Sequence, residues 1–352
     1  MVDILQEAKK LVEQIRFTGD TFRDKNTINL SQTNVVKDFS YTNDLLISND
    51  VTPLLYKSLN SVYKRLHIPK DAVEAFVFSS PEIQAECYTG DKTECVIRFS
   101  SALVQILNEK EFEFVAGHEI GHFLFGHRNI ISANQSFNIE FYMQKRAQEI
   151  SVDRVGFLAC ESLNTAIQAL MKTISGLTER HLRFDVGAFL SQLQKPSNYM
   201  LDSNMTSTHP SILVRCRALL WFSFDDYFSN NLKKFSRENI NKLDKRIQSD
   251  LDKYVDGPAK NQIEKVKENL AIWMSVYEIV QDKLFSKNEQ DKFAQRFGKD
   301  TLDRLKNYLK DIPESEVENI IYERLKAARE ELEMLIPNSF ESEIQTISKW
   351  KS

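Results

Sequence analysis

The chain has 352 residues, which is enough for two domains or one large domain with a sizeable hydrophobic core. Hydrophobic residues make up 42 % and charged residues 27 %, as in a soluble globular protein, and the net charge of −4 argues against a general nucleic-acid binder. No stretch approaches the roughly 20 apolar residues that span a bilayer, and no signal peptide is visible. The four cysteines form no Cys-x-x-Cys pair, so we expect reduced thiols in a cytoplasmic protein with no nucleic-acid partner and no stable membrane insertion.

The first part of the chain combines helical spacing with one β-rich region. Residues 1–70 are expected to form an N-terminal helical segment packed on the core, with one helix from Thr52 to about Leu66. Two runs, AVEAFVFSS and ECVIRFSS, lie on either side of a Gly90-Asp91 turn signal. A sheet is therefore predicted only over residues 72–100, and the fold class is mainly α with a small β-sheet (α+β).

Helices dominate after this region. Asn108 followed by Glu111 is a capping-box pattern, which predicts a helix from Glu109 to about Gly126. A long helix is predicted over 141–171, a polar loop over 198–211 and a helix over 212–224. Charges become dense after residue 225 and glycine nearly disappears. We therefore predict a core domain over 71–224 and a separate helical domain, a bundle, over 225–352.

The run His118-Glu119-Ile120-Gly121-His122 lies on the helix predicted over 109–126. Residues four apart share one face of a helix, with β-carbons about 5–6 Å apart. Two imidazoles in that arrangement can each place a nitrogen about 2.0–2.1 Å from one Zn²⁺. Glu119 lies beside the metal position, where a general base can take a proton from a water molecule. The pentapeptide arises by chance in about one chain of this length in a hundred, so a third ligand is needed to support it.

A catalytic zinc keeps three protein ligands and one open position. The candidates for the third ligand are His127, Glu140, Glu149 and His209. His127 follows His118 by nine residues, so on a continuing helix it points about 180° away and reads as a helix-end or core residue. Glu149 is favoured, because Asp153 follows it by four residues on the same predicted helix face. The glutamate can bind the metal while the aspartate accepts a hydrogen bond from a ligating histidine.

His209-Pro210 precedes the helix predicted over 212–224, and Arg215 lies about one and a half turns further on. Proline at the start of a helix is ordinary helix chemistry. The functional interpretation is that His209 and Arg215 face the zinc cleft. There they could stabilise an oxyanion, or His209 could occupy the open metal position.

Three motifs together resemble the HtpX-like family of gluzincin metallopeptidases, which also contains the type I CAAX prenyl proteases. The motifs are HEIGH at 118–122 with Gly126-His127 after it, EISVDR at 149–154, and the Thr208-His209-Pro210 segment through Arg215. The resemblance covers about residues 70–222. It implies a mostly helical catalytic domain with a small sheet and one Zn²⁺ per chain. It further implies that His118, His122 and Glu149 bind the zinc and that Glu119 is the catalytic base.

The strand ECVIRFSS resembles the edge strand of that family, along which a substrate peptide could pair. Its predicted substrate-facing residues are Cys95, Val96, Ile97, Arg98 and Phe99. Many family members are membrane-spanning or exported and this chain shows neither feature, so the prenyl-protease substrate does not transfer. Residues 230–350 lie outside the family core and faintly resemble tellurite-resistance protein B-like helical bundles.

These patterns predict a hydrolase, a zinc-dependent metalloendopeptidase that acts on protein or peptide substrates. Deformylases also use His-Glu-x-x-His but take an upstream cysteine ligand, and Cys87 and Cys95 lack the surrounding signature. The other alternative is a latent protein, with His209 on the zinc, or a non-catalytic zinc-fold protein that acts through its C-terminal helices.

Overall fold

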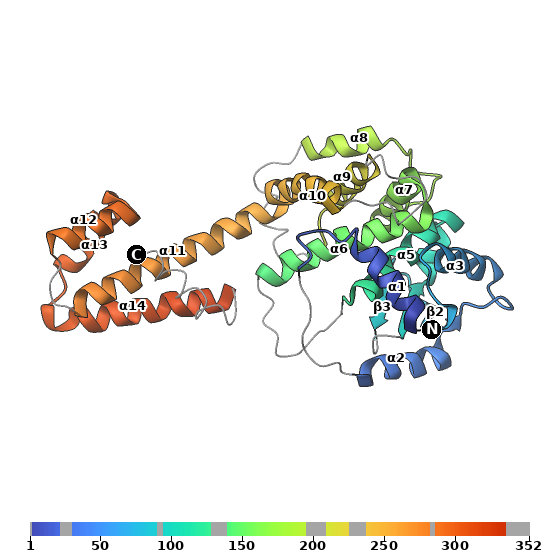
Figure 1. Cartoon of the computed structure of the whole chain (residues 1–352), viewed down its shortest axis with the longest axis horizontal. Coiled ribbons are helices and arrows are strands. Elements are labelled where there is room, and N and C mark those ends of the chain that lie inside the picture. The colour runs from blue at the N-terminus through green and yellow to red at the C-terminus, as the bar shows by residue number, and fades with distance from the viewer. Residues whose placement is uncertain are drawn as a thin grey trace. The chain divides into compact units, whose positions relative to one another are not determined.

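The computed structural model describes residues 2–21, 30–89, 94–127, 139–194, 209–224, 237–281 and 286–335 (Figure 1). They fall into two compact units. The first unit comprises Met1–Ala133 and Tyr142–Asp256, and the second comprises Asn134–Phe141 and Gly257–Ser352. The fold is mainly α with one four-stranded sheet, which confirms the predicted class. None of the described helices is long and apolar enough to cross a membrane.

The sheet of the first unit contains three strands in the predicted region and one short strand before it. In chain order the strands are β1 (Leu45–Leu46), β2 (Val73–Phe78), β3 (Ala85–Thr89) and β4 (Cys95–Ser100). The spatial order is β1-β2-β4-β3, with β2 and β4 parallel and the other two pairs antiparallel. The turn predicted at Gly90-Asp91 lies outside the described residues.

The prediction that the strand carrying Cys95–Phe99 is an edge strand is wrong. β4 pairs with β2 on one side and with β3 on the other, so both of its ladders are occupied. Five of its six residues are buried, and such a nearly continuous apolar run is typical of a central strand. Within the described part of the chain the edge beside β4 belongs to β3, whose residues are mostly half-buried.

Helices surround this sheet. Those before and directly after it are α1 (Val2–Glu13), α2 (Leu30–Asn43), α3 (Pro53–Arg65), the 3-10 turn η1 (Lys70–Ala72) and α4 (Ser101–Ile106). Those that follow are α5 (Glu109–Phe125), α6 (Ile139–Cys160), α7 (Leu163–Ser175), α8 (Val186–Leu190) with the 3-10 turn η2 (Ser191–Gln194), α9 (Ile212–Ser223) and α10 (Arg237–Leu251), then the π-helical turn Asp252–Asp256. The helices predicted over 52–66, 109–126 and 212–224 are therefore confirmed within a residue or two.

The long helix predicted over 141–171 is two helices, because the chain breaks between α6 and α7. Glu161 has a φ of 57°, in the left-handed region that ends a helix. The side chain of Ser162 then accepts a hydrogen bond from the backbone N–H of Thr165 and caps α7. Hydrophobic spacing alone could not show this break, because apolar residues continue through it. The loop predicted over 198–211 lies outside the described residues up to residue 208.

Helix α5 is buried on nearly all sides and begins at the predicted capping box. The Asn108 side chain accepts hydrogen bonds from two backbone N–H groups, and the carboxylate of Glu111 accepts one from the Asn108 N–H at 2.8 Å. Glycines allow α6 to approach α5 closely. A β-carbon on Gly117 would lie 2.3 Å from the Ala159 Cβ, and one on Gly156 would lie 2.7 Å from the Phe114 carbonyl oxygen.

The N-terminal segment packs against α5 and α6. Its apolar residues Leu5, Ala8, Val12 and Ile15 are buried in the main hydrophobic core. The Arg16 Nη2 donates to the Phe125 carbonyl at the end of α5 at 2.9 Å. The backbone N–H of Phe17 donates to Ser151 Oγ on α6 at 3.1 Å. This segment therefore contributes polar groups to the core as well as apolar side chains.

Helix α10 lies in the first unit, although a separate C-terminal domain is predicted from residue 225. Asp244 is fully buried, forms an ion pair with the buried Arg154, and accepts a hydrogen bond from the Thr18 N–H. Ile247 and Leu251 pack in a small apolar cluster with Phe17 and Ile150. The two compact units thus divide at Asp256 and Gly257.

The second unit is a set of four described helices. They are α11 (Gly257–Gln281), α12 (Lys287–Phe297), α13 (Lys299–Lys310) and α14 (Glu314–Leu335). Two small apolar clusters hold them together, one around Leu270 and Leu332 and the other around Val276 and Ile321. The likeness to tellurite-resistance protein B-like bundles stays a prediction.

Candidate metal centre

Two helices bring three possible metal ligands together. His118 and His122 lie one turn apart on α5, and Glu149 faces them from α6. Each Nε2 atom lies 3.5 Å from one oxygen of Glu149, His118 from Oε2 and His122 from Oε1. The ligand atoms of all three lie within 4.8 Å of one another. Within the described residues, this is the one group of three or more His, Cys, Asp or Glu side chains that could hold a metal ion.

The donor set fits a zinc ion. Two imidazole nitrogens and one carboxylate with an open fourth position are a ligand set that catalytic zinc uses. The Oε2 atom of Glu149 is shielded from solvent and has no hydrogen-bond partner within the described residues. A buried carboxylate oxygen that accepts no hydrogen bond is costly, and a cation bound at this point would reduce that cost. The pKa of Glu149 bears on this as well. Burial would raise it, but the interactions with His209, His122, Arg215 and His118 together hold it well below its ordinary value.

Asp153 orients the first histidine. Its Oδ1 lies 3.0 Å from His118 Nδ1, so an Nδ1–H donates to the carboxylate and leaves Nε2 as the atom that faces Glu149. Burial would raise the pKa of Asp153, but the charge and hydrogen bonds of Arg215 lower it, with His118 contributing. An ionised Asp153 can only accept hydrogen bonds, which fixes this tautomer of His118.

Arg215, predicted to face the zinc cleft, is held by Asp153. Its Nε and Nη2 donate to the two oxygens of Asp153 at 2.8 and 2.6 Å, a bidentate pair. Burial disfavours the charged guanidinium, but the Asp153 carboxylate outweighs this effect and raises the pKa of Arg215. The remaining Nη1 lies 3.5 Å from Glu149 Oε2. Two of its three nitrogens are thus committed to Asp153, and one faces the ligand carboxylate.

His209 lies at the open side of the three ligands. Its Nε2 is 3.5 Å from Glu149 Oε2, although more than half of the side chain is exposed. The Glu149 carboxylate would raise the pKa of His209, but burial of the ring nitrogen and the charge of Arg215 outweigh this and lower it. A neutral imidazole at this point can bind a metal or donate a hydrogen bond. The position matches the predicted one, and the role stays a prediction.

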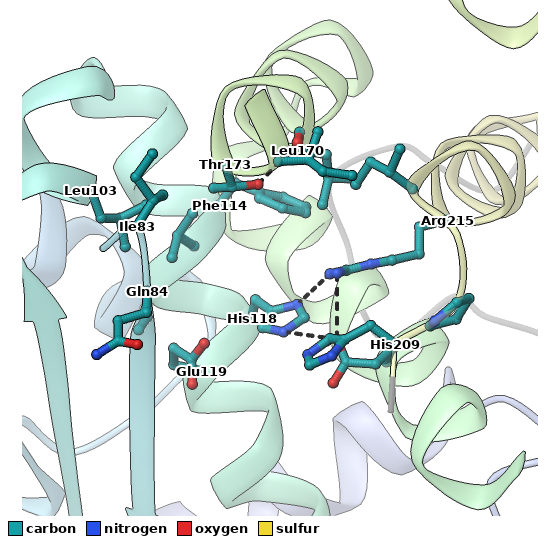
Figure 2. Close-up of a pocket in the computed structure, with 16 residues that line it drawn as sticks. Ile83, Gln84, Leu103, Phe114, His118, Glu119, Leu170, Thr173, His209 and Arg215 are labelled. Atoms are coloured by element: carbon teal, nitrogen blue, oxygen red, sulfur yellow. Dashed lines mark hydrogen bonds and ion pairs between the residues drawn. The ribbon is translucent and has the colours of Figure 1, made fainter. Parts of the chain in front are cut away.

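A cavity of about 390 Å³ opens beside this group (Figure 2). Glu119 lies between Gln84 and His118, while His209 and Arg215 lie on the other side of His118 (Figure 2). The Glu119 side chain has no hydrogen bond or ion pair within the described residues, so its carboxylate faces the cavity unengaged. The apolar wall is formed by Ile83, Leu103, Phe114, Val115, Leu170, Ile174 and Ile212.

His127 differs from its prediction in direction. Helix α5 ends at Phe125, and Gly126 at a φ of 71° turns the chain, so His127 does not continue the helix and point away. Its Nδ1 lies 3.1 Å from His122 Nδ1, and its Nε2 lies 3.0 Å from Asp20 Oδ2. It is buried, as a core residue should be, with both nitrogens engaged. The side chain of Glu140, the other carboxylate considered, lies outside the described residues.

Sequence reasoning missed the polar groups behind His122. Burial lowers the pKa of His127 to about 4, so its imidazole is neutral near pH 7. Burial would raise the pKa of Asp20, but the hydrogen bond with His127 and the nearby charges lower it overall. Ser151 Oγ donates to the same carboxylate at 2.7 Å. The one sequence signal was Ser151 itself, a hydroxyl on the Glu149-to-Asp153 segment of α6.

The sequence of residues 52–143 matches the model of peptidase family M48. The matched segment holds the sheet from β2 onward and α5 with His118, Glu119 and His122. This segment of the chain is therefore similar to the peptidases of family M48. The family implies a zinc metallopeptidase that hydrolyses peptide bonds, in line with the predicted resemblance. Glu149 and Asp153 lie beyond the matched segment, and the packing of α6 against α5 brings them to the α5 histidines. Searches of curated proteins and of solved structures found no match to the chain.

Proposed function

We propose that this protein is a zinc-dependent endopeptidase that acts on extended polypeptide. The supporting observation is the meeting of His118 Nε2, His122 Nε2 and Glu149 at one point, with Glu119 facing the adjoining cavity. These three side chains would hold the zinc. When bound, zinc would polarise the scissile carbonyl and lower the pKa of a water molecule in the fourth position.

Glu119 acts as the general base. It follows His118 directly on α5, so its carboxylate lies beside the ligand set but is not part of it. Glu119 takes a proton from the attacking water and later gives it to the leaving amine nitrogen. Because this carboxylate has no hydrogen bond or ion pair among the described residues, it is available for both transfers.

His209 and Arg215 act on the opposite side of the cavity. His209 donates a hydrogen bond to the oxyanion that forms from the scissile carbonyl. Arg215 braces Asp153, which in turn fixes the His118 ring. A second candidate role for His209 follows from its 3.5 Å distance to Glu149, because its imidazole could fill the fourth position in a latent form. His209→Ala separates these roles. Peptidase activity should rise if His209 blocks the fourth metal position, and it should fall if His209 donates to the oxyanion.

The substrate pairs along the edge of β3 that has no partner strand within the described residues, and β3 replaces β4 in this role. The Gln84 carbonyl accepts from the Ser100 N–H, and the Gln84 N–H donates to Ser100 Oγ, both on the β4 side. The backbone N–H of the next residue, Ala85, therefore points to the opposite edge of β3. Ala85 also lines the cavity. Ala85→Pro removes this N–H and no ladder bond to β4. We expect a higher KM for peptide with unchanged zinc content, and an unchanged KM would contradict the pairing.

The deciding test joins metal analysis to a casein cleavage assay. We expect about one zinc per chain in the purified protein. Glu119→Gln should keep the zinc and lower kcat by about 10²- to 10⁴-fold. Protein without zinc, or a Glu119→Gln variant as active as the wild type, would contradict the proposal. Cleavage of formyl-methionyl peptides with no cleavage of internal bonds would favour a deformylase.

In the non-catalytic alternative, the protein acts as a binding or regulatory protein through its C-terminal helices. A truncation after residue 225 would remove Asp244 and leave Arg154 buried without its partner, so it tests folding as well as function. A truncation after Asp256 keeps the first unit whole. If this shorter chain still cleaves casein, the second unit is not required for peptidase activity.

A further inference from the structure

The second histidine of the metal centre has its own chain of hydrogen bonds, which leads to the N-terminal segment. His122 Nδ1 lies 3.1 Å from His127 Nδ1, and His127 Nε2 lies 3.0 Å from Asp20 Oδ2. Asp20 and His127 are both buried. Asp20 belongs to the N-terminal segment, outside the 52–143 segment that matches the family.

We propose that His127 and Asp20 are positioning residues that hold His122 in the tautomer required for metal binding. The inference rests on the metal site of the proposed function. It assigns a role to His127, a histidine that is not a ligand, and to Asp20, which lies 107 positions before it in the chain.

The protonated nitrogen of each histidine ring follows from Asp20, the carboxylate at the end of this hydrogen-bond chain. An ionised Asp20 can only accept hydrogen bonds, so the Nε2 of His127 carries a proton and donates it. A neutral imidazole then has a bare Nδ1, which can only accept. His122 Nδ1 must therefore carry a proton and donate to it. The Nε2 of His122 is left with its lone pair, and that atom faces Glu149 at 3.5 Å.

The N-terminal segment fixes Asp20 in place. Ser151 Oγ donates to Asp20 Oδ2 at 2.7 Å and accepts from the Phe17 N–H at 3.1 Å. Arg16 Nη1 lies 3.5 Å from Asp20 Oδ1, and its Nη2 donates to the Phe125 carbonyl. One serine of α6 and one arginine thus tie the carboxylate to the helices that carry the ligands.

The experiment measures zinc affinity by competition with a chromophoric chelator, independently of peptidase activity. Asp20→Asn and His127→Phe should each weaken zinc binding by about 10- to 100-fold, as is usual for residues that orient a metal-binding histidine. Because both act through one hydrogen-bond chain, the double variant should bind zinc about as weakly as either single variant. His127→Asn should lose less than His127→Phe, since its amide oxygen can still accept from His122.

A control separates positioning from stability. Tyr63→Phe removes a buried hydrogen bond to the Val73 carbonyl, 3.2 Å long, and should lower stability without changing zinc affinity. Variants at Asp20 and His127 that bind zinc as tightly as the wild type would overturn the inference, as would losses that add in the double variant. Wild-type protein that binds no zinc would overturn the metal site and this inference with it.

A measurement on the unaltered protein covers the case in which the variants do not fold. Nitrogen-15 NMR of the zinc-loaded protein distinguishes protonated from bare ring nitrogens, and the chain has only six histidines. We expect His127 to be protonated at Nε2 and His122 at Nδ1. A proton on His127 Nδ1 would overturn the proposed tautomers.

Discussion

The surroundings of His118 and His122 differ, although one helical turn separates the two rings. The support of His118 is direct, through Asp153 and then the guanidinium of Arg215. The support of His122 is indirect, through the neutral ring of His127 and then Asp20. The first is an ion pair between α6 and α9, while the second extends to the N-terminal segment.

Because of this difference, the two supports should contribute differently to protein stability and to metal affinity. The carboxylate beside His118 sits in a buried pair of opposite charges, so removing it changes both the orientation of the ring and the electrostatics of the core. Behind His122, the one negative charge is that of Asp20, whose carboxylate contacts the Ser151 hydroxyl, the His127 imidazole and, at a longer distance, Arg16. Changes there should affect metal affinity more than stability.

The largest effect is expected at Asp153. Asp153→Ala leaves Arg215 buried beside Glu149 without its bidentate partner, and side chains of this pair are 12 % and 2 % exposed. Breaking a buried ion pair in this way costs about 3–5 kcal/mol. Urea unfolding of the metal-free protein should show this loss.

A double variant serves as the control for Asp153. Asp153→Ala with Arg215→Met removes the stranded charge as well, and should recover much of the stability but not the zinc affinity. If Asp153→Ala were no less stable than Asp20→Asn, the two supports would be electrostatically alike and the comparison would fail.

A smaller effect, on both supports together, is expected at Gly117. Gly117→Ala would place a β-carbon 2.3 Å from Ala159 Cβ and force α6 away from α5. Overpacking of this kind costs about 1–3 kcal/mol in the free energy of unfolding. Glu149 and Asp153 both lie on α6 and should move with the helix, so zinc affinity should fall although neither Asp153 nor Asp20 is substituted.

Gly187→Ala is the matched control, because its added β-carbon would meet only the Asp185 Oδ1 at 3.4 Å, an ordinary contact. It should leave both zinc affinity and stability close to those of the wild type. A Gly117→Ala protein with unchanged zinc affinity would show that Glu149 does not depend on the close approach of the two helices.

The sequence predicts the His118 side of the site better than the His122 side, for a physical reason. Spacing along one helix determines which residues share a face, so the α5 histidines and the Glu149-Asp153 pair could be expected together. The capping box at Asn108 predicts the start of α5 for the same local reason. Asp20 could not be found this way, because only the packing of distant segments brings it to His127.

Two further features, the position of β4 in the sheet and the direction of His127, differ from their predictions. Whether β4 is central or an edge depends on which strands pair with it, and that pairing involves residues from Leu45 to Thr89. The direction of His127 depends on Gly126, which turns the chain out of the helix. Glycine after a helix is a known stop signal, and giving it more weight would have redirected the interpretation of His127.

The smallest effect is expected at Ser151, which ties Asp20 to α6. Ser151→Ala removes the donor to Asp20 and the acceptor of the Phe17 N–H, and a typical hydrogen bond contributes about 0.5–1.5 kcal/mol to stability. Ser61→Ala is the matched control, because its hydroxyl donates only to the Lys57 carbonyl on exposed α3 surface. Zinc affinity should fall less in Ser151→Ala than in Asp20→Asn, since His127 still has its carboxylate. Equal losses in the two variants would mean that Asp20 is placed by the Ser151 hydroxyl alone, and the support of His122 would then depend on α6 as fully as that of His118 does.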